Sequence, residues 1–404
     1  MDTSHQQAPR NTDAAEDQGP SGLDRPARER GGGDRPTKRA LVLAGGVALG
    51  AYEAGAYEAL EAEGVPPDWI VGASIGAVNA AILAGNPPGR RVEQLRRFWK
   101  SVARDPTPVT SFLLGPPPDA GPWRKVYNEA SALRTMLSGN AGLFRPKPPP
   151  GALLGATPGL YDLQPLRERL PELLDFERLN GGEVRLSITA TDVATGERVV
   201  FDTARGARIG PEHVAASSAL MPLMAPVEVE GRLLSDGGLA ANTPLDVVLD
   251  EPMAGDLLCF VVELFSLEGG PPSSLADALS RAVDLSFGNQ TRRILEGRRR
   301  EHRLRALVGR LSARLPPHLR DDPEVASILA DAGAGARAAT VLCITRRPPP
   351  DEAHPGGAFD FSPATLEDRW AAGARGVREA LRRLGESPGG MNPAPGLVVH
   401  EVRT

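Results

Sequence analysis

Several features are scarce or missing in this sequence, and each excludes a class of protein. Cysteine occurs only twice, at Cys259 and Cys343, inside apolar runs, so we expect buried free thiols and no disulfide-dependent secreted fold. The six histidines are scattered, and no spacing suggests a ligand cluster, so we expect no metal and no cofactor.

Long apolar runs are also missing. No stretch of about 18 apolar residues occurs, so we expect no helix to span a membrane. The N-terminus lacks the apolar core of a signal peptide, which makes the cytoplasm the expected location. The net charge of only -5 gives no electrostatic reason to expect nucleic acid as a partner.

What is abundant is glycine (45 residues) and proline (39), which favour loops and close helix contacts. With 41% hydrophobic and 24% charged residues, the 404-residue chain has the composition of an ordinary globular protein. That length is sufficient for one large core or two domains.

Apolar runs alternate with helical patterns along the chain, which predicts a three-layer α/β architecture with a mostly parallel sheet. We predict strands at 38–43, 69–72, 184–191, 197–201, 257–264, 339–345 and 397–402. We predict helices at 51–63, 75–83, 91–102, 125–137 and 273–315, and one that begins at Ser362-Pro363.

Two segments differ from this pattern. Residues 1–36 are polar and rich in glycine and proline, and we expect a disordered N-terminal tail. The region around 103–158 is a proline-rich insertion, which either overhangs a site as a lid or forms a surface excursion.

The segment Gly72-Ala73-Ser74-Ile75-Gly76 has the spacing of a nucleophile elbow. Its serine follows a four-residue apolar strand and opens a helix of small residues, as the elbow geometry requires. In a glycine-rich chain the pentapeptide alone is weak evidence for a nucleophile, so the prediction depends on its strand–turn–helix context.

Two further segments complete an acyl-transfer site. The loop 45–50 lies between a predicted strand and a predicted helix, where backbone N–H groups can hold an oxyanion. It matches neither common phosphate-binding glycine pattern. Asp236-Gly237-Gly238 follows another apolar stretch and supplies a candidate base, although such a tripeptide is also common in turns.

Five segments, in order along residues 39–245, resemble the motifs of the patatin-like phospholipase family. They are the loop at 43–55, the elbow at 72–77, a connecting segment at 160–166, the stretch at 216–226 and the aspartate motif at 236–244. The region from Ser273 to about Leu384 resembles an extension of some bacterial patatin-like proteins.

The resemblance implies a three-layer α/β/α patatin-like fold and a Ser–Asp dyad without histidine. Ser74 would attack an acyl carbonyl of a lipid or phospholipid, and Asp236 would accept its proton, with release of a free fatty acid. The oxyanion would be held by N–H groups of Gly45, Gly46 and Val47, and the motifs would be supported by Gly50, Gly72, Gly76, Gly237 and Gly238. As the only base, Asp236 should have a raised pKa.

The same resemblance implies the domain organisation. Residues 37–268 would form the hydrolase domain, with the insertion around 103–158, and residues 269–404 a mainly helical extension packed on it. Oligomeric state is not indicated by the sequence.

Two positions depart from the family pattern. Val47 stands where a third glycine is usual, and Leu49 where a basic residue is usual. Because a β-branched residue resists positive φ, these departures predict a shifted loop and either weak activity or an unusual substrate.

Two alternatives remain open on the sequence alone. One is an α/β-hydrolase esterase with a Ser–Asp–His triad, in which His302 or His318 follows Ser74 and Asp236 along the chain. The other is a catalytically weak patatin-like protein that contacts a membrane surface through the arginine-rich stretch 292–305, which is otherwise a solvated helix face.

Overall fold

The computed structural model describes residues 37–108, 111, 117–147, 158–251, 255–331, 338–349, 352, 356–387 and 396–403. The expected tail at 1–36 and parts of the proline-rich insertion lie outside these residues.

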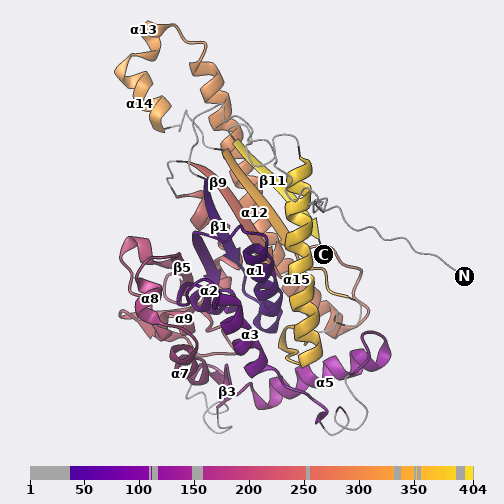
Figure 1. Cartoon of the computed structure of the whole chain (residues 1–404). Coiled ribbons are helices and arrows are strands. Elements are labelled where there is room, and N and C mark those ends of the chain that lie inside the picture. Colours follow the sequence, from indigo (N-terminus) through magenta and orange to yellow (C-terminus); the bar gives the residue numbers. More distant parts are fainter. Residues whose placement is uncertain are drawn as a thin grey trace, which may run out of the picture. The chain divides into compact units, whose positions relative to one another are not determined.

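A nine-stranded sheet forms the centre of the fold (Figure 1). Its hydrogen-bonded order is β11 (Gly396–Arg403), β10 (Ala338–Thr345), β9 (Asp256–Glu263), β1 (Thr37–Leu43), β2 (Trp69–Ala73), β5 (Arg185–Asp192), β8 (Arg232–Asp236) and β7 (Val227–Val229). Neighbours from β11 to β5 are parallel, whereas β8 pairs antiparallel with β5 and β7, and β6 (Arg198–Asp202) pairs antiparallel with β5. The mostly parallel sheet is thus confirmed.

The described helices lie on both faces of this sheet or, at 317–331, beyond one end of it (Figure 1). They are α1 (Gly50–Ala62), α2 (Ile75–Ala84), α3 (Arg91–Val102), α5 (Pro122–Ser138), α7 (Gln164–Leu173), α8 (Phe176–Asn180), α9 (Pro211–Ser217), α10 (Gly238–Ala241), α11 (Leu245–Leu249), α12 (Leu275–Ser312), α13 (Pro317–Arg320), α14 (Pro323–Asp331) and α15 (Pro363–Glu386). Short 3-10 helices are η1 (Val47–Leu49), η2 (Thr203–Arg205) and η3 (Gly357–Phe359), and β3 (Arg145–Pro146) pairs with β4 (Tyr161–Asp162) in a separate small sheet.

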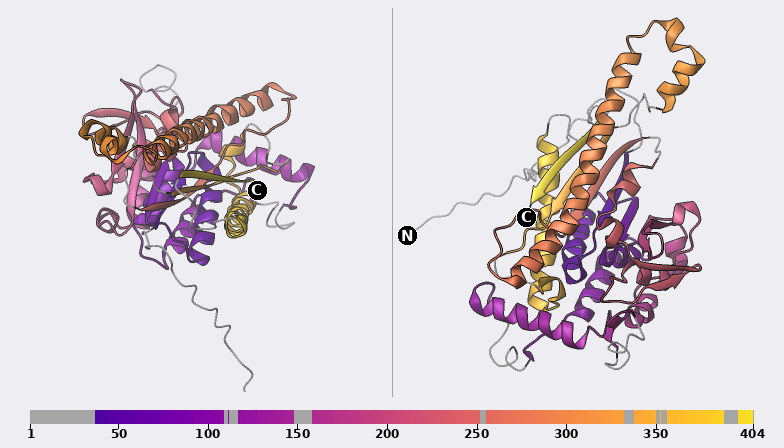
Figure 2. Two further views of the ribbon diagram at one scale, coloured as in Figure 1. Left: turned by 90° about the horizontal axis from the view of Figure 1, so that it is seen from above. Right: turned by 180° about the vertical axis from the view of Figure 1, so that it is seen from behind.

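Successive side chains of the buried strands point to opposite faces of the sheet, and this alternation produces two apolar layers. Leu41 and Leu43 of β1 face the core shared with α1, α2 and α15, whereas Ala40 and Val42 face the core shared with α11 and α12. Figure 2 shows α12 across the opposite face of the sheet from α1. Strands buried on both faces need continuous apolar runs, which is why the sequence pattern located them. Cys259 and Cys343 are buried free thiols, as predicted.

The predicted elements lie within a few residues of the observed ones, from β1 to β11. The C-terminal region is mainly helical, as expected, and its strands β10 and β11 continue the central sheet beside β9. Residues from Pro36 onward form one compact unit, and strands from both sides of the expected boundary at 268/269 belong to the central sheet. Among the described helices, none has both the length and the apolar character needed to cross a bilayer.

Candidate active site

Ser74 occupies the sharp turn between β2 and α2. Its backbone has φ 55° and ψ -125°, an unusual conformation for a residue with a side chain. A strained turn of this kind aims the hydroxyl away from the strand end, and helix α2 directs its positive end toward the same place. The segment predicted to be a nucleophile elbow therefore has the backbone conformation that such an elbow requires.

The two glycines of the elbow permit the close approach of strand and helix. A Cβ atom on Gly72 would lie 2.5 Å from the carbonyl oxygen of Gly76, and one on Gly76 would lie 2.5 Å from that of Leu43. Contacts this short are with backbone atoms, which have little room to move. Any larger residue at either position would displace Ser74.

Asp236 ends β8 and faces the serine. Its carboxylate accepts the Gly238 N–H at 2.7 Å and lies near enough to the Ser74 side chain for that side chain to influence its pKa. The residue is 2% exposed. Burial raises its pKa to about 6, although the Ser74 side chain and the Gly238 N–H act in the opposite direction. The expected desolvation of this carboxyl is thus present.

The glycine loop stands beside the elbow because β1 and β2 are neighbours, with Leu43 opposite Gly72. The N–H of Gly45 donates to the carbonyl of Asn242 at 3.1 Å, so it is not free for the oxyanion role that we predicted for it. Gly46 and Val47 also line the cavity at Ser74, and their N–H groups have no protein acceptor among the described residues. They are the available donors.

Val47 adopts φ 52°, in the region that β-branched residues avoid. The loop therefore holds a β-branched residue at positive φ and stores strain there. Leu49 is buried and lines the cavity with its side chain.

Three polar residues that the sequence analysis left without a role position this machinery. Asn242 donates through Nδ2 to the Gly45 carbonyl at 3.1 Å, in addition to accepting the Gly45 N–H. Ser217 accepts the Ser74 N–H at 3.0 Å and donates to the Thr189 carbonyl at 2.7 Å. The motif stretches contained both residues, but only the fold shows what they contact.

The third residue, Gln290, comes from α12 in the C-terminal region. Its Oε1 accepts the Asn242 N–H at 2.7 Å, and its Nε2 donates to the Gly238 carbonyl at 3.4 Å. The C-terminal region thus fastens the segment that follows the aspartate. No local signal distinguishes this glutamine from other polar residues of a long helix.

Ser74 and Asp236 open into a cavity of about 650 Å³. Its walls are mostly apolar and include Leu220, Leu239, Leu264, Phe265 and Phe287. Much of this wall belongs to the loop 264–272, the first turns of α12 and η3, all outside the motif segments. Among the described residues of the insertion around 103–158, none lines the cavity, whereas many residues of the C-terminal region do.

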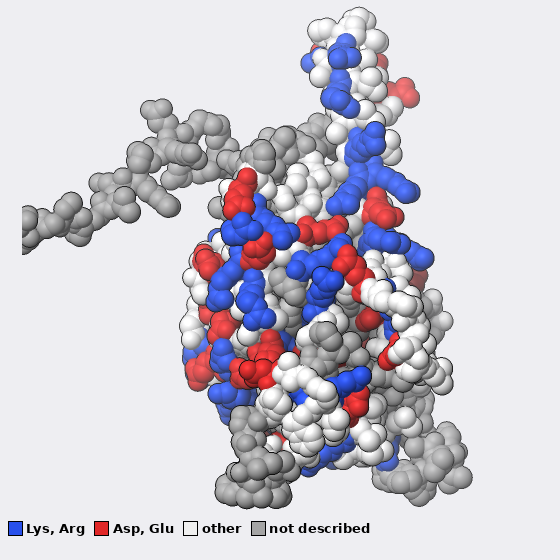
Figure 3. Space-filling view, turned by 90° about the vertical axis from the view of Figure 1, so that its right-hand side faces the viewer, with Lys and Arg blue, Asp and Glu red and all other residues white. Residues whose placement is uncertain are grey.

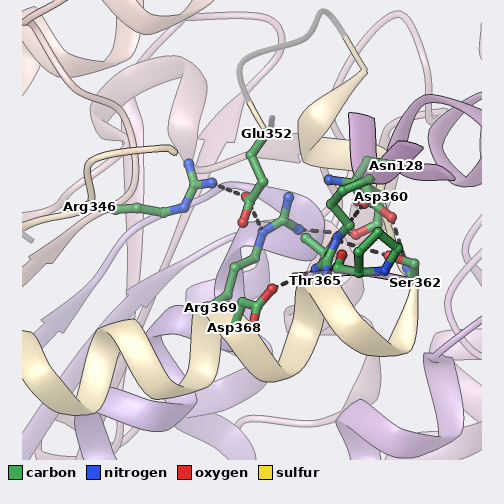
Figure 4. A network of polar contacts seen from close by, with 10 residues as sticks. Asn128, Arg346, Glu352, Asp360, Ser362, Thr365, Asp368 and Arg369 are labelled. Atoms are coloured by element: carbon green, nitrogen blue, oxygen red, sulfur yellow. Dashed lines mark hydrogen bonds and ion pairs between the residues drawn. The ribbon is translucent and has the colours of Figure 1, made fainter. Parts of the chain in front are cut away.

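A buried ion cluster holds one side of this wall (Figure 4). Glu352 binds both Arg346 and Arg369, and Arg369 also donates to the Gly357 carbonyl at 2.9 Å. Burial alone would raise the pKa of Glu352, but the two guanidinium groups lower it to about 2. The cluster fixes η3, which lines the cavity.

Among the described residues, no histidine lines the cavity that contains Ser74. His302 lies on α12 and His318 on α13, and neither lines the cavity that contains Ser74. His213 accepts the Gly210 N–H through Nδ1 at 3.0 Å and packs edge-on against Phe201, which is a structural role. Asp236, in contrast, lines the same cavity as Ser74 and has its pKa influenced by the Ser74 side chain.

Several arginines of the stretch 292–305 pair with acidic side chains. Arg298 pairs with Asp250 and Glu301, and Arg305 pairs with Glu301 at 2.6 Å. The end of α12, together with α13 and α14, projects from the rest of the fold (Figure 1). Figure 3 shows basic side chains gathered near this arm, with acidic ones among them. The stretch has the character of a solvated helix face.

Comparison with known proteins agrees with this site. Residues 41–249 match the model of the patatin-like phospholipase family, and residues 285–386 match a second model described as patatin phospholipase. The second match covers most of the predicted C-terminal extension.

Individual relatives are distant. A patatin-like phospholipase domain-containing protein of Caenorhabditis elegans is 30% identical over 212 residues, which are 52% of this chain and 12% of that protein. Lysophospholipase NTE1 of Candida glabrata is 24% identical over 59% of this chain and 11% of its own length. An uncharacterized NTE family protein of Mycobacterium bovis is 27% identical over 64% of this chain and 59% of its own.

Among solved structures, VipD from Legionella pneumophila is 16% identical with a TM-score of 0.36, covering 86% of this chain and 67% of that one. A likeness of that size carries no argument about function. The first family model, in contrast, matches just over half of the chain and includes the glycine loop, the elbow and the aspartate motif. The chain therefore belongs to the patatin-like phospholipase family.

Proposed function

We propose that this chain hydrolyses carboxylic esters of lipids or phospholipids, with Ser74 as the nucleophile and Asp236 as its base. The observation that carries the proposal is the position of the Ser74 side chain beside the buried carboxyl of Asp236, with both residues lining one apolar cavity. The names of the relatives, among them a lysophospholipase, support the same class of reaction.

In the first step, Ser74 Oγ attacks the acyl carbonyl while Asp236 takes the hydroxyl proton. The negative charge that develops on the carbonyl oxygen is held by the N–H groups of Gly46 and Val47. Collapse of this intermediate breaks the ester bond, and the alcohol or lysophospholipid leaves with the proton that Asp236 had taken.

In the second step, Asp236 is again ionised and removes a proton from water, which attacks the acyl-serine. The serine regains its proton as the ester breaks, and a free fatty acid leaves. One carboxylate serves both steps because its pKa of about 6 permits it to gain and lose a proton near neutral pH.

The cavity fits an acyl chain better than a polar substrate. An acyl chain that packs against its leucine and phenylalanine side chains is removed from water, which contributes about 25 cal/mol of binding free energy per Å² of apolar surface buried. Residues of the C-terminal region form much of this wall, so they would determine which acyl chains the cavity accepts.

A fluorophosphonate probe and a p-nitrophenyl acyl ester test the proposal directly. We expect the probe to label Ser74, and Ser74→Ala to abolish both labelling and hydrolysis, with melting temperature retained. Asp236→Ala should lower hydrolysis by at least about a thousandfold, because it removes the only base.

His302→Ala and His318→Ala are the controls, and both should retain activity. Loss of activity in either histidine variant, together with an active Asp236→Ala protein, would support the triad and refute the dyad.

A further inference from the structure

Helix α5 turns its polar side inward and its apolar side outward. The buried side chains are mostly polar, namely Arg124, Asn128, Ser131 and Thr135, together with Tyr127 and Ala132. The exposed ones are Trp123 (51%), Val126 (53%), Leu133 (55%) and Leu137 (73%), which follow one another at helical spacing. A helix on the surface of a globular protein normally has the opposite orientation, so this face has the character of an interface.

The orientation of α5 is fixed by its polar side. Arg124 donates to Asp368 of α15 at 2.6 Å and to Thr365 at 3.3 Å. Thr365 in turn donates to Asn128 at 3.0 Å (Figure 4). Rotating α5 to bury its leucines would break these bonds and leave buried polar groups unpaired.

The first turns of α12 present a second exposed apolar row. Leu275 is 80% exposed, Leu279 62% and Val283 44%, each four residues after the last. Leu279 and Val283 also line the cavity that contains Ser74. This row therefore begins in solvent and continues into the candidate substrate site.

The two apolar rows belong to one end of the fold. The pKa of Asp277 on α12 is lowered by hydrogen bonds from Ser273 and Ser274 and also by Lys125 of α5, so the two helices lie within electrostatic range. Helix α5 also packs against η3, another part of the cavity wall. Figures 1 and 2 both show α5 at the end where α12 begins.

We propose that this rim, made of Trp123, Val126, Leu133, Leu137, Leu275 and Leu279, docks on a lipid surface. The inference rests on the proposed function in one respect, since a lipid ester is the substrate that would pass from the surface into the cavity. Docking there lets an acyl chain move from the bilayer to Ser74 along apolar side chains without crossing water.

The charges around the rim decide the kind of surface. Lys125 and Arg134 are accompanied by Glu129 and Asp277, so the rim carries both signs. Docking is driven by apolar burial and has no requirement for anionic lipid. It differs in this from binding through an arginine-rich helix, which depends on anionic lipid and weakens with salt.

The test uses the full chain with Ser74→Ala, which keeps vesicles intact, and flotation with neutral phosphatidylcholine vesicles. The rim variant is Leu133→Ser/Leu137→Ser, which does not touch the cavity. Its matched control is Leu304→Ser/Leu311→Ser on the far half of α12, where the side chains are 63% and 66% exposed. We expect at least about tenfold weaker binding for the rim variant and parental binding for the control.

Tryptophan fluorescence gives a second measurement. Trp123 is 51% exposed, whereas the other three tryptophans are at most 5% exposed. Vesicles that contain brominated lipid should therefore quench the emission of Trp123, and Trp123→Phe should remove the quenching. Absence of quenching in the parent protein would contradict the proposal.

The remaining outcomes separate docking from catalysis. With Ser74 restored, the rim variant should hydrolyse soluble p-nitrophenyl butyrate at the parental rate but vesicle lipid at least about tenfold more slowly. If the protein with Ser74 intact hydrolyses no ester while the Ser74→Ala protein floats, the proposed function is refuted and docking is left intact. Docking is refuted by parental flotation of the rim variant, by loss of flotation in the control alone, or by a lipid-free dimer that the rim variant converts to a monomer.

Discussion

Asp236 must be ionised before it can take a proton from Ser74. Because burial raises its pKa to about 6, the active form of the base is lost as the pH falls through that value. We expect kcat/KM for a soluble ester to be level above pH 7 and to fall about tenfold per pH unit well below 6. A profile that stays level down to pH 4.5, with the fold intact, would exclude Asp236 as the base.

The same shift affects stability. The native carboxyl has a pKa of about 6 against 3.8 when unperturbed, so the native state holds its proton more tightly than the unfolded state. The stabilising contribution of this group is complete below pH 4 and is lost as the pH rises toward 6. Asp236→Asn should therefore be inactive yet more stable than the parent at pH 8, by up to about 3 kcal/mol.

Denaturant unfolding at pH 4 and pH 8 measures this effect. The advantage of the Asp236→Asn protein should be large at pH 8 and small at pH 4. Equal differences at the two pH values would show that the carboxyl is not desolvated in solution.

Val47 supports a second prediction about stability at the scale of single residues. Its φ of 52° strains the loop, and glycine adopts that conformation freely. We expect Val47→Gly to raise the free energy of unfolding by about 1 kcal/mol, whereas Val47→Ala, which keeps a Cβ at positive φ, should not. Thermal melts of the three proteins give the comparison, and a destabilised glycine variant would mean that packing of Val47 outweighs its strain.

At the scale of elements, the contact between α1 and α15 depends on two glycines. A Cβ on Gly55 would lie 1.9 Å from the Trp370 carbonyl oxygen, and one on Gly373 would lie 1.9 Å from that of Tyr52. Because both neighbours are backbone atoms, the helices would have to move apart. This contact joins the first helix of the hydrolase motifs to the last helix of the chain.

Gly373→Ala should therefore destabilise the protein by about 2 to 3 kcal/mol. Gly309→Ala is the matched control on α12, where a new Cβ has no neighbour within 4 Å. That control should gain about 0.5 to 1 kcal/mol from helix propensity. A Gly373→Ala protein as stable as the parent would show that the two helices are not in close contact.

These elements also show how far sequence reasoning reaches. Strands β1 and β2, the elbow at Ser74 and the end of β8 at Asp236 were predicted because each has a local apolar run followed by a turn. Gln290 could not be found in that way, since it contacts Asn242 across 48 positions of the chain. The occupied N–H of Gly45 was missed for the same reason, because its acceptor lies on a distant segment.

At the scale of the whole molecule, the motif-bearing region depends on the C-terminal one. Strands β10 and β11 cover the edge of β9, and α15 covers α1. We predict that a chain ending at residue 268 will be insoluble or lack cooperative unfolding, because it exposes a long apolar edge and a helix face. A chain without residues 1–36 should melt within about 2 °C of the parent, in keeping with the tail we expect there.

Solubility, circular dichroism and thermal melts of the two truncated chains decide this point. A soluble, cooperatively folded 1–268 chain would contradict this prediction and support 268/269 as a domain boundary.

Helix α12 spans both functions of the site, since its early turns line the cavity and Gln290 farther along ties down the turn after Asp236. The chemistry and the choice of substrate are thus carried by different stretches of one scaffold. Substitutions at positions such as 279 and 283 can reshape the space for the acyl chain while the nucleophile and its base stay where they are. New lipid preferences can arise in this protein by changes in a helix that contains neither of them.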